Sequence, residues 1–203
     1  MKSHLIHRRQ FLGASLGAAG LALAGGQAMA HNPPANFVLP DDYLPVEVDL
    51  AVELAPGEIH VNPDTFRLYW TLEGNRAMRY TVGVGRGGLY HDGEFFIGAK
   101  KEWPSWRPTD EMIARNPGYA RWADGMPGGI NNPLGARALY LFQPGRGDTF
   151  LRIHGTNLPQ TIGTAVSNGC ARLTNEHIVD LYDRVPLETR VVLYPKGNGM
   201  VLA

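Results

Sequence analysis

The chain has 203 residues, of which 44% are hydrophobic, and it carries 19 basic and 19 acidic residues. This length and apolar content suit one globular domain with a hydrophobic core. Residues 1–30 hold three basic residues and no acidic one, so the rest of the chain has 16 basic against 19 acidic residues and a net charge near −3. Such a mildly acidic protein lacks the basic surface expected of a partner for nucleic acid or an anionic membrane, which excludes both function classes.

The first 30 residues resemble an export signal. The pair Arg8-Arg9 stands in H-R-R-Q-F-L, a weakly apolar run follows over 11–24, and Ala28-Met29-Ala30 offers a small-x-small cleavage site. The apolar run is shorter than the ~20 residues that a membrane-spanning helix needs. We therefore predict a twin-arginine-like signal peptide over 1–30 and a periplasmic protein, with an uncleaved anchor as the alternative and no stable membrane span in the mature chain.

The next part of the chain changes from a proline-rich segment to a β pattern. Residues 31–56 are rich in proline and acidic residues and are expected to form a linker or an ordered wrap on the domain surface. Apolar residues then alternate with others over 68–72 and 78–84, on either side of a Glu-Gly-Asn turn. This pattern predicts a β-hairpin with one buried face.

Further strand patterns cover residues 94–101, 138–142, 149–154 and 190–194. In the third of these segments Leu151 and Ile153 share one face, and the other face holds Phe150, Arg152 and His154. His154 therefore ends a strand and precedes Gly155, which suits the presentation of a side chain in a cleft.

One helix is predicted before the last strand. Thr174 is a good N-cap residue, Glu176 suits the first turn, and Pro186 ends the helix. Its apolar stripe consists of Ile178, Leu181, Tyr182 and Val185. Residues 103–135, by contrast, are rich in glycine and proline and predict long loops, which in a compact domain are often functional.

The only cysteine, Cys170, cannot form a disulfide within the chain and is a candidate nucleophile. A thiol attacks as the thiolate, and His154 is the best candidate to take its proton. The backbone N–H groups of Gly169 and Cys170 can stabilise an oxyanion, and Arg172 can bind a carboxylate or orient the loop. The alternative is an inert thiol packed in the core, but the residues next to Cys170 are polar or small, which is unusual for a core position.

Metal and phosphate sites have less support in the sequence. The histidines that a metal could use are scattered and show neither H-x-x-x-H nor C-x-x-C spacing: His60, His91, His154 and His177. The glycine string at 83–88 lacks the Lys-Ser/Thr pair of a phosphate-binding loop and predicts a turn. We expect no metal and no other cofactor.

Several short motifs occur in order across residues 57–195: I-H-V-N-P, P-S-W-R-P-T, N-P-L-G, I-H-G-T-N and S-N-G-C-A-R-L. Together they resemble the YkuD-type L,D-transpeptidase family. The resemblance implies a mostly β fold, an L,D-transpeptidase-like β-sandwich with one or a few short helices and long loops around the catalytic cleft. Residues 57–195 would form this catalytic domain, and residues 196–203 a C-terminal tail.

The resemblance also implies the catalytic roles. Cys170 would be the nucleophile and His154 the general base, with a backbone carbonyl of Gly155 or Ser167 orienting the imidazole. Ser167 and Gly169 stand at their motif positions beside the nucleophile.

Three residues are expected to contact substrate: Arg172, Asn168 and Trp106. Arg172 matches the family's arginine two residues after the cysteine, and Asn168 stands where the family often has histidine. Trp106 and Asn132 fall in motifs that border the cleft, and each is expected to be structural rather than catalytic.

The implied reaction is a two-step acyl transfer on peptidoglycan stem peptides. The thiolate attacks the peptide bond before the terminal D-alanine of a tetrapeptide stem, D-alanine leaves, and an amine takes the acyl group from the thioester. The acceptor would be a second stem or an outer-membrane protein. Two alternatives stay open: a hydrolase on the same scaffold, acting as an L,D-carboxypeptidase or on a wall-protein anchor, and a non-catalytic wall-binding module.

Overall fold

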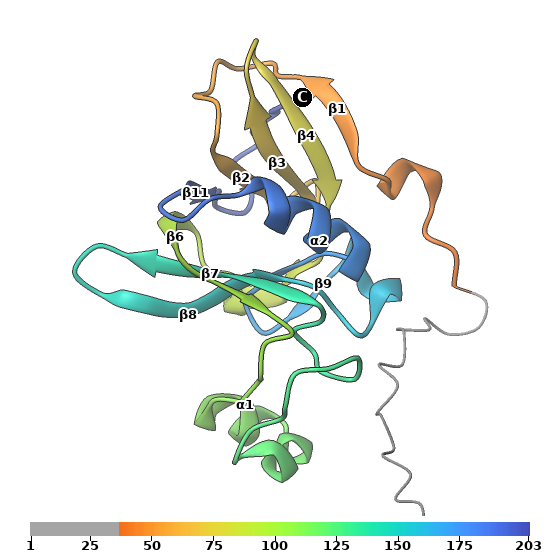
Figure 1. Ribbon diagram of the computed structural model, residues 1–203, viewed down its shortest axis with the longest axis vertical. Helices are drawn as coiled ribbons and strands as arrows, with labels where there is room; N and C mark the ends of the chain where they lie inside the picture. Colours follow the sequence, from red (N-terminus) through yellow and green to blue (C-terminus); the bar gives the residue numbers. More distant parts are fainter. Residues whose placement is uncertain (1–36) are drawn as a thin grey trace, which may run out of the picture.

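The computed structural model describes residues 37–203, and its fold is mostly β, as predicted (Figure 1). One nine-stranded sheet has the order β1-β4-β3-β2-β11-β6-β7-β8-β10, and β5 and β9 form a second, two-stranded sheet. The strands are β1 (Val46–Asp49), β2 (Ile59–Asn62), β3 (Arg67–Leu72), β4 (Arg76–Thr81), β5 (Val84–Gly85), β6 (Gly93–Glu102), β7 (Arg137–Gln143), β8 (Gly147–His154), β9 (Ala165–Ser167), β10 (Ala171–Arg172) and β11 (Arg190–Leu193).

Helices are few and short. They are α1 (Asp110–Arg115), α2 (Asn175–Arg184) and the 3-10 turns η1 (Asp41–Tyr43), η2 (Gly87–Leu89), η3 (Pro117–Trp122) and η4 (Pro159–Thr161). The predicted helix is α2, where the Thr174 hydroxyl accepts the His177 N–H at 3.3 Å. Within residues 37–203, no helix has both the length and the apolar character needed to cross a membrane.

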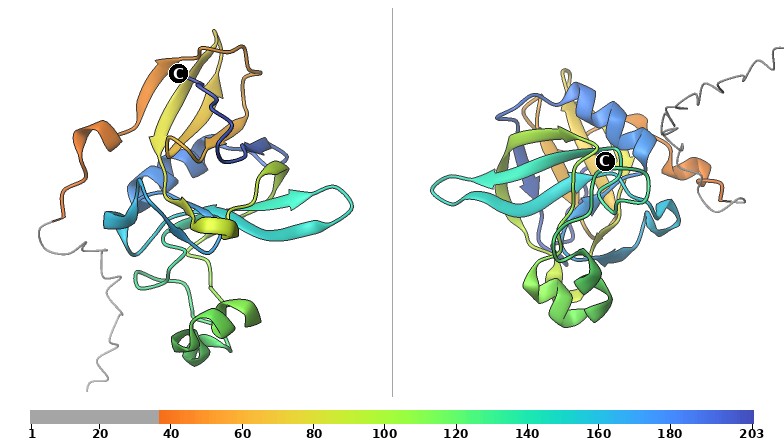
Figure 2. Two further views of the ribbon diagram at one scale, coloured as in Figure 1. Left: turned by 180° about the vertical axis from the view of Figure 1, so that it is seen from behind. Right: turned by 60° about the horizontal axis from the view of Figure 1, so that its bottom comes forward.

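Strands from both halves of the large sheet share one hydrophobic core with α2. Leu68 of β3, Leu139 of β7, Ile153 of β8 and Ile178 of α2 are all fully buried in it. Burial of such a side chain stabilises the fold by about 1.5–3 kcal/mol. Figures 1 and 2 show the large sheet curling, with α2 lying across one side of it. The two halves of the large sheet that enclose the core therefore belong to one continuous, curled sheet.

The predicted hairpin is confirmed as β3 and β4, which pair antiparallel. Leu68 and Trp70 face the main core, as the alternation requires. The expectation of a single buried face is wrong, because Tyr69 on the opposite face is only 3% exposed. Leu50 and Leu202, which flank the hairpin in space but not in sequence, cover that face.

The chain leaves the hairpin earlier than its sequence pattern indicates. β4 ends at Thr81, and Val84 belongs to β5, which pairs with β9. Between them, Gly83 exchanges two backbone hydrogen bonds with Arg172, at 2.9 and 2.8 Å. The hairpin thus delivers its C-terminal end to β10, the strand that follows the cysteine.

The two ends of the described chain pack on the large sheet. The part of segment 31–56 that the structure describes contains η1 and β1, and β1 adds an antiparallel edge strand beside β4. In the segment 196–203, Leu202 is 1% exposed, and its carbonyl accepts the Ala51 N–H at 2.8 Å. The export signal predicted over 1–30 lies outside the described residues.

Residues 103–135 do not form loops alone, because they contain α1 and η3. The structure shows this segment, coloured green, as a lobe that projects from the sheets (Figures 1 and 2). Thr109 caps α1 by accepting the Met112 N–H at 3.3 Å, and Asp110 and Glu111 occupy the first turn. This Thr-Asp-Glu start was a readable helix signal that the surrounding glycines and prolines masked. We refer to residues 103–135 as the α1 lobe.

Candidate active site

A cavity of about 1150 Å³ lies between the α1 lobe, β8 and the turn that precedes β10. Most of the site residues predicted from the sequence line it: Trp106, His154, Ser167, Asn168, Cys170 and Arg172. Gly155 and Gly169 do not line the cavity, and they lie directly beside His154 and Cys170 in the chain. The structure thus gathers side chains from three separate segments around one space.

Parallel pairing of β8 with β10 brings the histidine and the cysteine together. The register places Arg172 opposite His154 and Ala171 opposite Ile153. Cys170 comes directly before β10, and alternate residues along a strand share a face. His154, Arg172 and Cys170 accordingly all open into the cavity, while Ala171 and Ile153 point into the core.

His154 is held as a neutral imidazole with a defined orientation. Its Nδ1 lies 2.6 Å from the Gly155 carbonyl oxygen, which leaves Nε2 as the nitrogen that can accept a proton. Burial, and then the charge of Arg172, lower the pKa of His154 to about 3, although the hydrogen bond to Gly155 favours the protonated form. The other carbonyl expected for this role, that of Ser167, instead accepts the Arg86 N–H at 3.0 Å.

Cys170 is a thiol rather than a thiolate in this environment. Burial raises its pKa, and a hydrogen bond from the Arg152 backbone together with the charges of Arg152 and Arg172 partly opposes that rise. The side chain is partly exposed to the cavity. A neutral thiol and a neutral imidazole that line the same cavity indicate that the proton moves when substrate is attacked, not beforehand.

The turn before Cys170 is braced by Ser167. Its hydroxyl donates to the Cys170 carbonyl at 2.7 Å and accepts the Gly169 N–H at 3.2 Å. The Gly169 N–H is therefore already used, contrary to the expectation that it would help to stabilise an oxyanion. Among the described residues the Cys170 N–H has no hydrogen-bond partner, which leaves it as the available donor.

Gly169 serves the turn through its shape. It has a φ of +132°, and a Cβ there would lie 2.9 Å from the Leu89 carbonyl oxygen. A side chain at this position would push the turn away from η2 and move Cys170 with it.

Arg172 is a buried cation with unused hydrogen-bonding capacity. It is 8% exposed, and its Nε and Nη2 atoms have no partner in the described part of the chain. Burial lowers its pKa, yet arginine stays charged at neutral pH. A buried guanidinium with open N–H groups at the edge of a cavity is suited to bind a carboxylate.

The remaining predicted residues differ in their surroundings. Trp106 lines the cavity, contacts Tyr119 edge-on at 5.4 Å between ring centroids, and exchanges backbone hydrogen bonds with Met126. Asn168 is partly exposed in the cavity wall. Asn132 is fully buried, where its amide binds the Pro127 carbonyl at 2.9 Å, so it braces the loop.

Asn175, the first residue of α2, was missed by the sequence reasoning. Its Oδ1 accepts the Ala136 N–H at 2.9 Å, and a Cβ at Gly155 would lie only 2.3 Å from that oxygen. Asn175 therefore fixes the spacing between α2, the loop before β7 and the glycine whose carbonyl binds His154. The only local signal was an amide side chain directly after the helix cap.

Replacing Asn175 by alanine is expected to leave the buried Ala136 N–H unsatisfied and to destabilise the fold by about 1–3 kcal/mol. Urea unfolding checks this expectation, and the rate of alkylation of Cys170 by iodoacetamide reports any change at the site. Asn175→Asp is the matched control, because it keeps the accepting oxygen. An alanine variant as stable as the unmodified protein contradicts the bracing role.

Acid sensitivity should follow from the buried histidines. Burial lowers the pKa values of His60, His154 and His177 below the ordinary 6.5. The unfolded chain then binds protons before the folded one, so the free energy of unfolding falls as pH drops below 6.5. Urea unfolding at about pH 7.5 and about pH 5 avoids most carboxylate titration. We expect the free energy of unfolding to be clearly lower at about pH 5 than at about pH 7.5, and the difference to be smaller in His177→Gln. An equal free energy of unfolding at the two pH values would contradict the lowered pKa values of the buried histidines.

Metal ligation has no structural counterpart in the described part of the chain. No three His, Cys, Asp or Glu side chains within residues 37–203 lie close enough together to hold a metal ion.

Comparison with known proteins identifies the family of the chain. The family described as the YkuD L,D-transpeptidase catalytic domain matches residues 56–193. The Escherichia coli protein named probable L,D-transpeptidase ErfK/SrfK is 33% identical over 181 residues, which cover 82% of this chain and 55% of that protein. The chain thus spans about half the length of this relative.

Solved structures extend the comparison to the fold. A Brucella melitensis protein named as a probable carnitine operon oxidoreductase is 47% identical, with a TM-score of 0.53, over 77% of this chain and 96% of that one. The name of that protein does not mention L,D-transpeptidases. Its similarity to this chain rests on the aligned sequence and the shared fold. An Enterococcus faecium L,D-transpeptidase is 14% identical, with a TM-score of 0.52, over 70% of this chain and 50% of that one, and shows the shared fold.

Proposed function

The chain belongs to the YkuD family of L,D-transpeptidase catalytic domains, and we propose that it is a cysteine L,D-transpeptidase acting on peptidoglycan stem peptides. One observation carries the proposal: Cys170 and His154 both line one large cavity, and the His154 Nδ1 is held 2.6 Å from the Gly155 carbonyl oxygen. Neither an inert packed thiol nor a wall-binding module accounts for a histidine oriented in this way.

The first step forms a thioester. His154 Nε2 takes the proton of the Cys170 thiol as Sγ attacks the carbonyl carbon before the terminal D-alanine of a tetrapeptide stem. The developing oxyanion accepts the Cys170 N–H. When the C–N bond breaks, the imidazolium returns the proton to the departing amine, so that D-alanine leaves and the acyl group stays on Sγ.

The second step transfers the acyl group. An acceptor amine attacks the thioester carbonyl, and His154 takes the proton that the amine loses. The C–S bond breaks, an amide bond forms, and the proton returns to the Cys170 sulfur, which restores the starting state. No cofactor enters either step. The acceptor amine is the side-chain amine of a second stem or an amine of an outer-membrane protein.

Arg172 would couple binding of the substrate carboxylate to the basicity of His154. Arg172 lies opposite His154 in the strand register and lines the cavity, and two of its guanidinium nitrogens have no hydrogen-bond partner among the described residues. Its charge contributes to the low pKa of His154. A D-alanine carboxylate bound to Arg172 would neutralise part of that charge and make the imidazole a stronger base while the substrate is present. Asn168 and Trp106 would complete the walls around the stem.

The place of action follows from the substrate. We propose that residues 1–30 are an export signal of the twin-arginine type and that the protein acts in the periplasm. Residues 57–195 would be the catalytic domain, with 31–56 as a linker or surface wrap and 196–203 as a C-terminal tail. The lack of a second cysteine fits this compartment, because a disulfide would consume the nucleophile.

Product analysis tests the function directly. The purified chain is incubated with a defined tetrapeptide stem and an excess of an amine acceptor, and the products are separated by mass. A joined product and stoichiometric D-alanine support transfer. Shortened stems without any joined product would assign the site to hydrolysis, and unchanged stems would overturn both enzymatic activities.

A further inference from the structure

The charged side chains that line the cavity are almost all arginines. They are Arg107, Arg115, Arg121, Arg146, Arg152 and Arg172, and Asp92 is the single carboxylate among the lining residues. This concentration stands out in a chain whose basic and acidic residues are equal in number. A cavity lined with one sign of charge concentrates ligands of the opposite sign.

The α1 lobe separates its charges between two faces. Arg107, Arg115 and Arg121 line the cavity, whereas the acidic residues of the same lobe do not: Asp110, Glu111 and Asp124. Within residues 37–203 these three arginines take part in no ion pair. Their positive charge is therefore available to a ligand.

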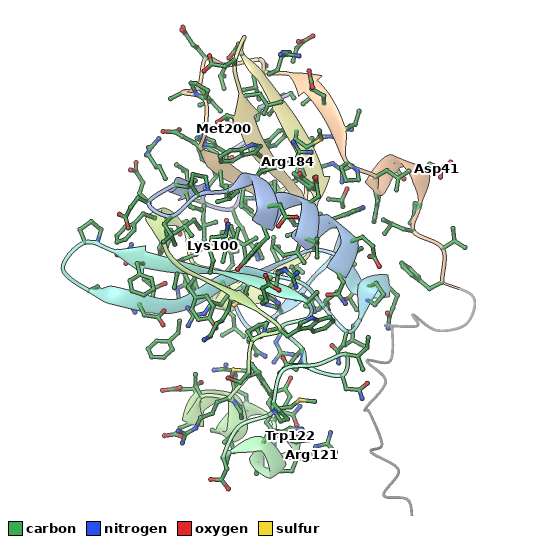
Figure 3. All side chains as sticks on the ribbon, viewed as in Figure 1. Asp41, Lys100, Arg121, Trp122, Arg184 and Met200 are labelled. Carbon is green, nitrogen blue, oxygen red and sulfur yellow. The ribbon has the colours of Figure 1, made fainter. Side chains whose placement is uncertain are left out.

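An aromatic side chain supports one of these arginines. Arg121 lies over the Trp122 ring, 5.7 Å from its centroid, and both side chains belong to the lobe (Figure 3). Trp122, Trp106 and Tyr119 also line the cavity. Arginine on an aromatic face keeps its planar N–H groups directed at a partner, which suits bidentate recognition of a carboxylate.

The lobe arginines lie apart from the carboxylate site at Arg172. Arg172 is buried in β10, next to the cysteine, whereas Arg107, Arg115 and Arg121 are exposed on the opposite wall. A ligand that places a carboxylate at each wall carries more than one negative charge. The terminal carboxylate of the stem would occupy Arg172 and leave the lobe to other carboxylates of the same peptide.

We infer that Arg107, Arg115 and Arg121 make the enzyme select stem peptides whose carboxylates other than that of the terminal D-alanine are free rather than amidated. This inference rests on the proposed function and adds a substrate preference to it. The selected group is a carboxylate, because the arginine fork binds it with two parallel hydrogen bonds that a neutral amide cannot offer.

The test compares two tetrapeptide stems that share the terminal D-alanine carboxylate. One has its other carboxylates free, and the other has them amidated. We expect kcat/KM for acylation of Cys170 to be on the order of tenfold higher with the free stem, and this ratio to shrink as salt is added. The variant Arg107→Gln/Arg115→Gln/Arg121→Gln should lose that advantage and keep its rate with the amidated stem.

The matched control removes the same charge elsewhere. Arg79→Gln/Arg86→Gln/Lys101→Gln changes three side chains that do not line the cavity and take part in no ion pair among the described residues, and its preference should be unchanged. Thermal unfolding and iodoacetamide alkylation verify that both variants are folded with a reactive Cys170. Equal rates with both stems in the unmodified protein, or an equal loss in the control, overturn the inference and leave the function standing. If neither stem acylates Cys170, the proposed function fails and the inference with it.

Discussion

Replacing Cys170 by alanine is expected to abolish release of D-alanine from tetrapeptide stems. Both steps of the proposed reaction pass through the Cys170 sulfur, and the chain has no other thiol that could substitute. Loss of a nucleophile leaves only the contribution of binding and of the oxyanion donor, so a fall of about 10⁶-fold is the appropriate scale. An enzymatic assay for free D-alanine measures the effect.

The fold should survive this substitution. Cys170 is partly exposed to the cavity and does not belong to the hydrophobic core. Thermal unfolding of the alanine variant should therefore match that of the unmodified protein. A Cys170→Ala variant that still releases D-alanine and unfolds normally would show that the Cys170 sulfur is not the nucleophile.

Replacing His154 by glutamine is expected to slow acylation by about 10²–10⁴-fold, the usual contribution of a general base. Because burial lowers the pKa of His154 to about 3, the imidazole of the unmodified protein stays neutral far below 6.5. The acid limb of its kcat/KM profile should accordingly lie well below pH 6.5, where an ordinary histidine would already be protonated.

The pH profile of the glutamine variant separates a catalytic from a structural role. Without a base, acylation depends on the small thiolate fraction, so its rate should rise about tenfold per pH unit up to the thiol pKa. A merely structural histidine would lower the rate without changing the profile. A profile of the unmodified protein that falls around pH 6.5 would contradict the neutral, buried imidazole.

The strands with alternating apolar residues were predictable, and the shortest strands were not. Leu68 and Trp70 identify β3 because the period of two is local information. β10 has two residues and β9 three, so neither is long enough to show a period. Their pairing depends on contacts with β8 and β5, which are distant in sequence. The burial of Tyr69 likewise depends on Leu202, more than a hundred residues away.

The two residues proposed to react could be predicted because Cys170 is the only cysteine and His154 stands at the end of a predicted strand, before a glycine. A single cysteine and a histidine at a strand end are visible in the sequence, and their meeting in one cavity needs only the strand register. The resemblance limited the partner of His154 to the carbonyl of Gly155 or of Ser167, and the sequence could not decide between the two. Only the fold shows that the Gly155 carbonyl accepts from His154 while the Ser167 carbonyl binds Arg86.

The grouping of the three lobe arginines on one wall of the cavity could not be predicted, for a different reason. Arg107, Arg115 and Arg121 are separated by several residues and are interleaved with Asp110 and Glu111, so the sequence shows mixed charge. Because α1 and η3 turn their basic side chains toward the cavity, the wall exists only in three dimensions. Residues 103–135 were expected to form loops, and their sequence shows no helical periodicity from which a basic face could be predicted.

Intact-mass spectrometry of the chain incubated with a tetrapeptide stem tests the central claim most directly. The account predicts one covalent adduct per chain with the mass of the stem less D-alanine, mapped to Cys170 after digestion and removed by hydroxylamine, as expected of a thioester. Cys170→Ala should carry no adduct. An unmodified chain under conditions that release D-alanine, or an adduct that persists in Cys170→Ala, would contradict acyl transfer through this cysteine.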